Sequence, residues 1–288
     1  MHSDSRNVLM QRLNKLGTYA LLTILLLVVL FPTVWIVGQS FMPEEQILKW
    51  PVQIIPSEPT LDNYIEIFTT KLSRQELSLF RWLFNSVYVT TLSTIGVLLV
   101  TSMAGYAFAR LRFPGKQLLF FGLGASFLVP GVMLLIPSFM LMRALGWIDT
   151  HHALIWPPLA GFFGVFFMRQ FFLAIPSELA EAAVIDGASA FGIYRRVFLP
   201  LSRPAVATLG IFTFLFIWND FTWPLVVLNS DEMRTLPVGL VVFLGEYWTY
   251  QGIVMAGAVV SSAPVLVVYI IFQRQITRAV MATGFGGR

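Results

Sequence analysis

Long stretches of apolar residues without any charged side chain alternate along the chain with polar connections. Such charge-free windows cover residues 16–43, 82–109, 117–142, 150–168, 204–219 and 247–273. The fifth extends to Ser230 if the single interruption at Asp220 is tolerated. A helix that crosses a bilayer needs about 20 predominantly apolar residues. The pattern therefore predicts an all-α membrane protein with six transmembrane helices, near residues 18–40, 85–109, 118–142, 153–174, 204–228 and 252–273.

The composition supports a membrane-embedded chain. Of 288 residues, 57% are hydrophobic and 12% are charged, against about 25% charged in an ordinary soluble domain. The chain has no cysteine, which excludes a disulfide framework, a thiolate metal site and a cysteine nucleophile. Its basic residues lie singly and in small groups between the apolar runs, which argues against a nucleic-acid partner. The first apolar stretch is too long for the core of a cleaved signal peptide and has no A-x-A-like site after it, so we expect a retained anchor.

The distribution of Lys and Arg predicts the orientation of the helices, because cytoplasmic loops carry an excess of basic residues. One set of connections holds twelve, or thirteen with Arg169 near the end of the fourth helix, and the opposite set holds six. The twelve are Arg6, Arg12, Lys15, Arg110, Arg112, Lys116, Arg195, Arg196, Arg203, Arg274, Arg278 and Arg288. Both termini are therefore expected in the cytoplasm.

We expect three parts, a cytoplasmic N-terminal segment, one transmembrane domain and a cytoplasmic tail, at residues 1–17, 18–273 and 274–288. Two long connections, 41–83 and 229–251, face outward. The first contains an amphipathic stretch, 60–72, that predicts a short helix outside the bilayer.

The cytoplasmic connection 176–200 predicts two short helices joined by a turn. Ser177 can cap the first helix, and Gly187, which has no Cβ, suits the break after it. Ser189 can cap the second helix, and Pro200 is expected to end it before the fifth span.

One face of the first short helix carries Glu178, Glu181 and Ala182 at i, i+3, i+4 spacing. Ala182 and Ala183 keep the helix thin, so that a partner can approach closely. The alternative is an amphipathic hairpin on the lipid surface, with Phe191 dipping into the interface.

The motifs Glu181-Ala-Ala183, Asp186-Gly187-Ala-Ser189 and Leu199-Pro200 resemble the EAA signature of ABC importer permeases. Further stretches that match in order are residues 59–64, 85–86, 106–110 and 218–224. Together they resemble the carbohydrate-uptake branch of that family, and within it the shorter, six-helix permease of the maltose-transporter type.

This resemblance implies a permease subunit of an ATP-driven importer in a bacterial-type inner membrane, for a sugar, oligosaccharide, polyol or related solute. Such a subunit pairs with a second, related permease and with two copies of a cytoplasmic ATPase, and an external binding protein delivers the solute. The chain has no P-loop pattern, so ATP and Mg²⁺ belong to the partner ATPase, and the chain is not itself expected to be an enzyme. We expect no catalytic, cofactor or metal residues in it.

The resemblance also assigns residues to coupling with the ATPase. They are Glu178, Glu181, Ala182, Ala183, Asp186, Gly187, Ser189, Leu199 and Pro200. Glu181 would make a charge-assisted contact to the ATPase, and Gly187 would permit the bend. The tail 276–288 is only loosely similar to the family tails that reach the ATPase pair.

A polar pair, Asn219 and Asp220, interrupts the fifth span. A carboxylate near mid-bilayer costs about 2.5–3.5 kcal/mol on insertion scales, so it should face protein or water. One interpretation is solute contact in the pathway, with Trp218 and Trp223 offering aromatic faces to a sugar ring. The other is structural, with the pair bonded to neighbouring helices.

Other features are weaker predictors of function. An ion-coupled secondary transporter is the alternative function, but such a protein more often has inverted repeats and several intramembrane charges. Adjacent histidines 151 and 152 point in different directions and suit a loop rather than a metal site. Pro130 and Pro137 are expected to kink the third span. Glycines that suit close helix packing are Gly96, Gly105, Gly122 and Gly124.

Overall fold

The computed structural model describes residues 2–51, 53–69, 79–246 and 250–284, and its regular structure there is helical. The longer helices are α1 (His2–Ser40), α4 (Leu79–Arg110), α5 (Lys116–Ser126), α6 (Leu135–Ala144), α8 (Phe162–Ala174), α12 (Arg203–Trp218), α14 (Leu236–Glu246) and α15 (Gln251–Gly284). The shorter α-helices are α2 (Glu44–Ile47), α3 (Asp62–Thr69), α7 (His152–Ile155), α9 (Glu178–Ile185), α10 (Ala190–Ile193), α11 (Leu199–Leu201) and α13 (Thr222–Val227). Single turns of 3₁₀-helix are η1 (Gly131–Leu134), η2 (Pro157–Ala160) and η4 (Asp231–Met233), and η3 (Tyr194–Phe198) is a π-helix.

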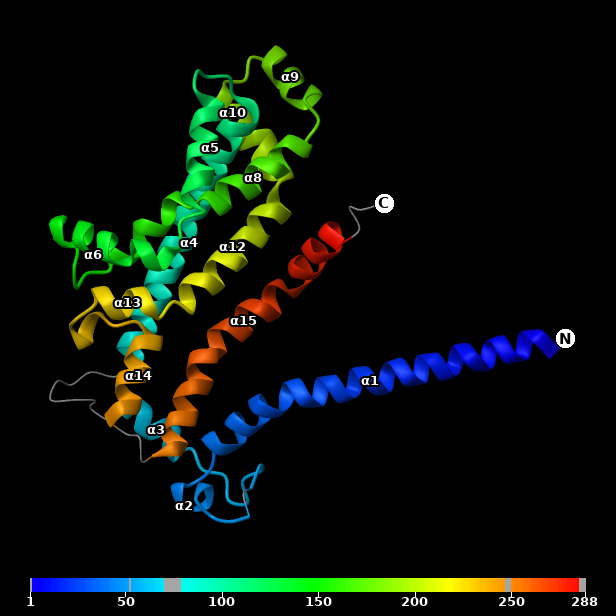
Figure 1. Cartoon of the computed structure of the whole chain (residues 1–288), viewed down its shortest axis with the longest axis vertical. Helices are drawn as coiled ribbons and strands as arrows, with labels where there is room; N and C mark the ends of the chain where they lie inside the picture. Colours follow the sequence, from blue (N-terminus) through cyan, green and yellow to red (C-terminus); the bar gives the residue numbers. More distant parts are fainter. Residues whose placement is uncertain (1, 52, 70–78, 247–249, 285–288) are drawn as a thin grey trace. The chain divides into compact units, whose positions relative to one another are not determined.

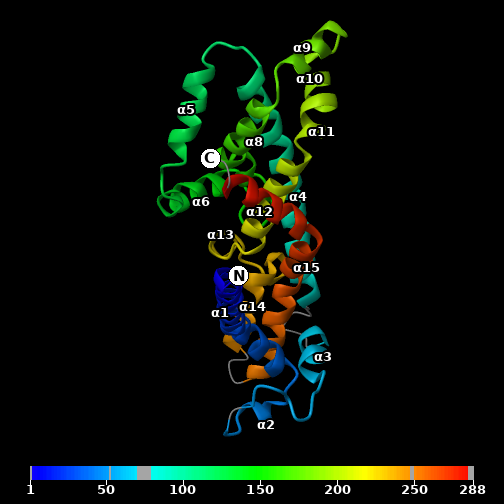
Figure 2. The ribbon, with the colours of Figure 1, turned by 90° about the vertical axis from the view of Figure 1, so that its right-hand side faces the viewer.

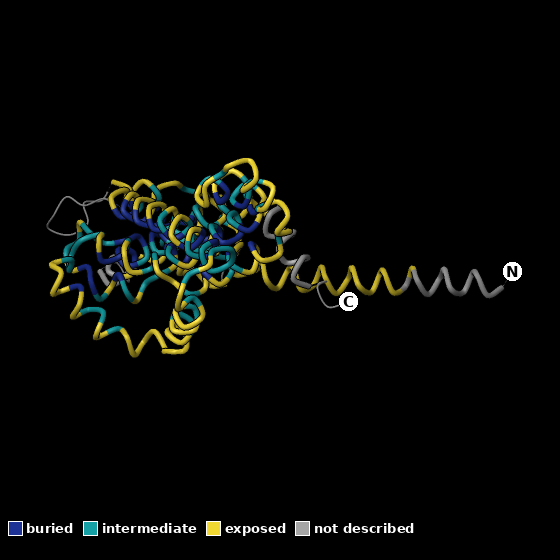
Figure 3. Tube along the Cα trace, turned by 90° about the horizontal axis from the view of Figure 1, so that it is seen from above, coloured by how far each residue is buried: buried dark blue, intermediate teal, exposed yellow. Residues whose placement is uncertain are grey.

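The chain forms two compact units, one of residues 1–70 with 243–260 and the other of residues 71–242 with 261–288. In the first unit, the Glu44 carboxylate accepts the N–H groups of Gln251 and Gly252 at 3.1 Å each. These N–H groups open α15 and have no partner within the helix, so a carboxylate there is favourable. Asn63 donates to the carbonyls of Ser40 and Met42 at 3.0 and 2.8 Å and so ties α3 to the end of α1. Between Leu16 and Val34, the apolar side chains of α1 are exposed (Figure 3).

In the second unit, α4 packs chiefly against α8 and α12 (Figure 1). Glycines permit the α4–α8 crossing. A Cβ on Gly105 would stand 2.8 Å from Met168 Cβ and 3.0 Å from the backbone nitrogen of Arg169. A Cβ on Gly164 would stand 2.7 Å from Thr101 Cγ2. The prediction of close packing is thus confirmed for Gly105. It is also confirmed for Gly96 and Gly124, where a Cβ would stand 2.5 Å from Leu159 Cδ2 and 3.2 Å from Phe162 Cζ. Gly122 has no neighbour within 4 Å, and the prediction is wrong there.

Three unbroken helical stretches are long and apolar enough to cross a membrane: Asn14–Ser40, Leu79–Arg110 and Gln251–Gln273. Three bent pairs of helices also qualify if each pair counts as one span, which gives up to six in the described residues. The pairs are Lys116–Ser126 with Gly131–Ala144, bent by 93°, His152–Ala160 with Phe162–Ala174, bent by 42°, and Ala190–Leu201 with Arg203–Trp218, bent by 79°.

The span expected over 118–142 is bent next to Pro130, as predicted for that proline, whereas the expectation of continuous helices over 153–174 and 204–228 is wrong. The first breaks before Pro130, which has no N–H to continue the ladder and precedes η1. The second breaks at Gly161, whose backbone is extended. The third ends at Trp218, because the chain leaves the helical path at Asn219–Phe221 before α13 begins. Pro137 lies in the first turn of α6, where a proline is tolerated, so no kink arises from it.

The two long connections predicted to face outward contain the expected short helix and one helix that was not expected. The amphipathic stretch forms α3 over Asp62–Thr69, and the remainder of the predicted 60–72 helix beyond residue 69 lies outside the described residues. Within the connection predicted at 229–251, α14 occupies Leu236–Glu246. Its apolar run is too short to suggest a span, so the sequence pattern did not indicate a helix there.

We expect Gly105→Val to destabilise the second unit, because overpacking of this kind costs about 1–3 kcal/mol. Gly122→Val is the matched control, since it places the same side chain in a helix with open space around it. Melting temperatures of the purified variants in detergent should fall clearly for Gly105→Val and little for Gly122→Val. Equal losses would mean that helix propensity, rather than the α4–α8 approach, sets the effect.

Candidate functional site

Residues 176–200 form a projecting helical segment at the end of the second unit where α4 ends (Figure 2). Its first helix, α9, has no buried residue. Leu179, Val184 and Ile185 are 44%, 60% and 86% exposed. Apolar side chains this exposed outside the apolar spans are suited to contact with another surface.

The turn after α9 has the geometry that the sequence indicated. Gly187 has φ +78°, in the left-handed region that favours glycine. The N–H of Gly187 donates to Val184 O and that of Ala188 donates to Ala183 O, both at 2.9 Å, which is the Schellman pattern of a helix end. Ser189 then caps the next helix by accepting the Gly192 N–H at 3.2 Å. Ser177 precedes α9 but makes no side-chain capping bond.

The two faces of α9 differ. Ala180 and Ala183 pack against the buried core of the unit, while Glu178, Glu181 and Ala182 are exposed. Asp186, at the C-terminal end, is exposed as well. The two alanines of the EAA motif therefore serve opposite purposes, since Ala183 allows the core to approach and Ala182 leaves the outer face free of bulk.

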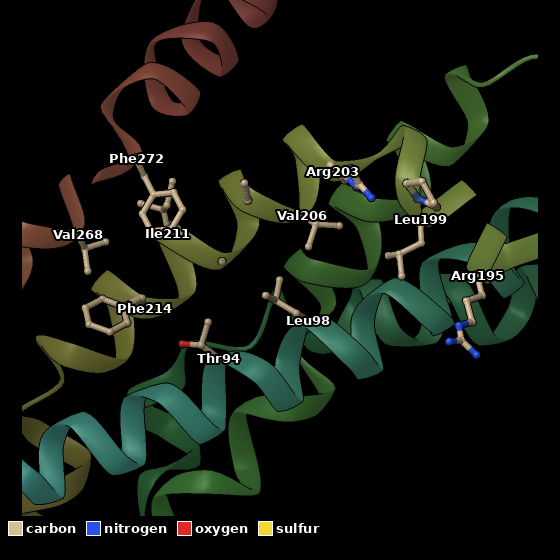
Figure 4. A pocket seen from close by; sticks show the side chains of 13 residues that line it. Thr94, Leu98, Arg195, Leu199, Arg203, Val206, Ile211, Phe214, Val268 and Phe272 are labelled. Atoms are coloured by element: carbon tan, nitrogen blue, oxygen red, sulfur yellow. The ribbon is translucent and has the colours of Figure 1, made fainter. Parts of the chain in front are cut away.

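The second helical run of the segment ends at Leu201, one residue after Pro200 and before α12, as expected. The helical run continues to Leu201 through the π-helix η3. Pro200 has no N–H to bond the carbonyl of Arg196 four residues earlier, which is consistent with the widened turn before it. Leu199 and Pro200 line a cavity of about 750 Å³, together with residues of α4, α12 and α15 (Figure 4).

A cluster of aromatic rings joins the segment to the core. Tyr106 of α4 lies with its ring centroid 5.4 Å from Tyr194, 5.2 Å from Phe198 and 6.1 Å from Phe172. The Tyr194 hydroxyl and Ser102 Oγ are 2.8 Å apart in the buried interior. This cluster fixes η3 against α4 and α8.

Asp220 lines a second cavity, of about 560 Å³, beside the break between α12 and α13. Other polar groups on its wall come from Ser86, Thr90, Ser138, Thr222 and Thr235. Asp220 is half-buried, and its Oδ1 accepts the N–H of Trp223 at 3.4 Å at the start of α13. The carboxylate therefore both faces a cavity and supports a helix start.

The side chains of Trp218, Asn219 and Trp223, next to Asp220 in the sequence, each donate a hydrogen bond to a backbone carbonyl. Trp218 is 2% exposed, stacks on Phe214 at 5.8 Å and donates to Ser261 O at 3.2 Å. Asn219 is exposed and donates to Leu215 O at 2.8 Å. Trp223 lies on the cavity wall and donates to Ala153 O at 2.9 Å. Of the four predicted pathway residues, Trp218, Asp220 and Trp223 share the cavity, and Asn219 is not on its wall.

Sequence reasoning assigned no role to Asp149. This residue lies in the connection between α6 and α7 and binds the backbone of residues 227–230. Its Oδ1 accepts two backbone N–H groups, of Asn229 and Ser230, and the Ser230 hydroxyl, each at 2.9 Å. Burial raises the pKa of this carboxyl, but the hydrogen bonds from Ser230 and Asn229 outweigh burial and leave the pKa below its ordinary value. The carboxylate is thus charged at neutral pH.

The two adjacent histidines have separate partners, in agreement with their expected divergence. His151 Nε2 lies 3.1 Å from Met233 O, and His152 Nδ1 accepts from Trp156 at 3.1 Å. Burial lowers the pKa of His151.

Residues 8–281 match the family described as binding-protein-dependent transport system inner membrane components. The chain belongs to this family. It is 36% identical over 263 residues to the arabinooligosaccharides transport system permease protein AraQ of Halalkalibacterium halodurans, covering 90% of this chain and 92% of that one. It is also 36% identical over 267 residues to the sulfoquinovosyl glycerol transport system permease protein SmoH of Agrobacterium fabrum, covering 92% of each.

A solved structure agrees with these relationships. The crystal structure of a bacterial ABC transporter involved in the import of the acidic polysaccharide alginate contains a chain with TM-score 0.80 and 26% identity, covering 91% of this chain and 96% of that one. The chain is thus the inner-membrane permease component of an ABC importer of the carbohydrate-uptake type, a multi-pass transport subunit whose ATP hydrolysis resides on separate subunits. The comparisons give no support to an ion-coupled transporter.

For this permease we expect Asp220→Asn to keep the assembled complex and change the solute concentration that half-saturates uptake. The amide oxygen can still accept the Trp223 N–H, while the charge on the cavity wall is lost. Asp220→Ala should in addition lower stability by about 0.5–2 kcal/mol, the usual effect of losing a helix cap. Uptake and thermal unfolding of both variants test this. Loss of complex in Asp220→Asn with unchanged selectivity would favour the structural interpretation.

Proposed function

We propose that this permease crosses the membrane six times with both termini in the cytoplasm. The spans lie near residues 18–40, 85–109, 118–142, 153–174, 204–228 and 252–273, and a broken span counts once. The support is the excess of twelve basic residues over six on the two sets of connections, which follows the positive-inside rule. Residues 1–17 and 274–288 are then cytoplasmic, and residues 18–273 form the transmembrane domain.

The segment 176–200 is proposed to dock in a cleft of a cytoplasmic ATPase subunit. The observation that carries this proposal is the projecting α9, which combines exposed apolar side chains, the exposed Glu181 carboxylate and the left-handed Gly187 in one short element. A plain connection between two spans would need none of these features. The alternative for this segment is a hairpin that lies on the lipid surface, and the coupling experiment below distinguishes the two.

The complete importer is proposed to contain a second, related permease, two copies of the ATPase that bind ATP and Mg²⁺, and an external binding protein. The family description, which names binding-protein-dependent transport, supports the last of these partners. Hydrolysis on the ATPase pair would move α9 and thereby switch the permease between outward and inward access.

The proposed solute is a sugar, oligosaccharide, polyol or a derivative of one. Relatives named for arabinooligosaccharides and for sulfoquinovosyl glycerol support a polyhydroxylated solute. In this chain, the hydroxyl groups, Asp220 and Trp223 on the wall of the 560 Å³ cavity could donate and accept hydrogen bonds to sugar hydroxyls and pack against a ring.

Reporter fusions test the topology. Fusions at residues 15, 113, 190 and 288 should report the cytoplasm, and fusions at 60 and 240 should report the outside. An outside signal at 190 would contradict the coupling assignment, because an ATPase could not reach the segment.

Two substitutions test coupling. Glu181→Ala removes a charge-assisted contact that costs about 1.5–3 kcal/mol to lose if it is buried in the interface. Gly187→Val forces a branched residue into the left-handed region and strains the turn. Both variants should insert normally, because neither position lies in a span, and both should lose ATPase association or its stimulation by loaded binding protein.

Gly146→Val is the matched control for the turn. Gly146 also has a left-handed φ, +69°, with open space around it, but it lies in an outward connection. Its substitution should leave ATPase retention unchanged. If Glu181→Ala and Gly187→Val also retained and stimulated the ATPase like the parent complex, the segment would be a lipid-surface hairpin instead.

A further inference from the structure

Arg110, the last residue of α4, is bonded to the C-terminal end of α8. Its Nε and Nη2 donate to Phe172 O at 3.2 and 2.7 Å, and Nη2 also donates to Ile175 O. The last carbonyls of a helix have no partner within the helix and carry partial negative charge, so a guanidinium there is doubly favourable. Ile175 is the residue immediately before the coupling segment.

The same guanidinium also reaches the far end of the coupling segment. The guanidinium carbon, Cζ, lies 5.0 Å from the ring centroid of Phe198. This phenylalanine is fully buried and is the last residue of the π-helix η3. A cation over an aromatic face at this distance is attracted to the ring. Arg110 therefore touches the chain just before residue 176 and again at residue 198, so that one side chain holds both ends of the segment.

No carboxylate in the described part of the chain pairs with Arg110. Its charge is met by carbonyl groups and a ring whose positions depend on the backbone of α8 and η3. Arginine suits this arrangement because its planar fork can donate to two acceptors while its face covers a ring, whereas the lysine ammonium is a point charge.

Arg169 of α8 provides a comparison within the molecule. It donates from Nε to Phe108 O of α4 at 3.2 Å, and its guanidinium lies 4.4 Å from the Phe120 ring centroid of α5. The chemistry is the same as that of Arg110, but Arg169 joins α8 to α4 and α5, and its guanidinium makes no hydrogen bond or cation–π contact with residues 176–200 in the described part of the chain.

We propose that Arg110 is the positioning residue of the coupling segment, and that it ties both ends of residues 176–200 to α4 and α8. A displacement of α9 by the ATPase would then move the core helices together with the segment instead of flexing it. The inference rests on the proposed coupling function, but the position of the segment can be measured without assuming that function.

The first measurement is spectroscopic. Because the chain has no cysteine of its own, spin labels can be attached at Met103→Cys on α4 and at Ala190→Cys at the start of α10, both exposed. The complex is reconstituted in lipid nanodiscs with cysteine-free partners, after the doubly substituted parent is shown to retain uptake. Arg110→Gln should broaden the distribution of label distances, and Arg169→Gln should leave its width unchanged.

The second measurement is functional, on the same complexes without labels. Arg110→Gln should reduce stimulation of ATP hydrolysis by loaded binding protein by about fivefold or more, the lower end of typical coupling between sites. Basal hydrolysis and retention of the ATPase should stay near those of the parent. Arg110→Lys should be intermediate, and Arg169→Gln should be close to the parent.

Unchanged label distances in Arg110→Gln would overturn the inference, as would equal broadening and equal loss of stimulation in Arg169→Gln, which would indicate general packing. If Arg110→Gln fails to assemble, Arg110→Lys carries the same test. Broadened distances with normal stimulation and uptake would support the positioning role and reject coupling by the segment, so the two proposals fail separately.

Discussion

The close approach of α4 and α8 is the contact on which the described core of this permease depends. Gly105 and Gly164 remove the side chains that would hold the helices apart. With the two backbones this near, Arg110 reaches the terminal carbonyls of α8 and the Tyr106 ring meets Phe172. Helices in lipid gain little from apolar burial against one another, so small residues and interhelical polar bonds must supply the association.

Breaks in the membrane helices are the second consequence of the lipid environment. Non-helical backbone at membrane depth is tolerated only where it is buried in protein or lines a cavity. The break at Asn219–Phe221 follows this rule, since Asp220 and Thr222 line the 560 Å³ cavity and Asp220 accepts the N–H of Trp223. Asp220 can therefore have both a structural role and a role in solute contact, because the same carboxylate accepts a hydrogen bond at the start of α13 and faces the cavity.

Polar side chains at the start of α4 organise the connection that follows α13. Trp82 donates to Asp231 O at 2.7 Å, Asn85 donates to Arg234 O at 2.9 Å, and Ser86 accepts the Leu236 N–H at 2.7 Å. Together with the Asp149 carboxylate, they satisfy backbone groups that no regular helix pairs. In the permease, the connection beside the 560 Å³ cavity is therefore held by hydrogen bonds from side chains. The coupling segment, which is cytoplasmic in the proposed topology, is held by aromatic rings and an arginine.

The sequence by itself determined the helical membrane class, the approximate location of the apolar segments, the turn at Gly187 and the cap at Ser189, because hydrophobic period, glycine conformation and capping are local properties. It also carried the motifs that placed the chain in its family. It could not determine the breaks at Gly161 and Asn219–Phe221, the helix α14, or which alanine of the EAA motif faces the core. It assigned no structural role to Arg110 or Asp149. The roles of Arg110 and Asp149 depend on partners far along the chain, since Phe172 O lies 62 residues from Arg110 and Ser230 lies 81 residues from Asp149. Only the packed tertiary structure brings these partners together.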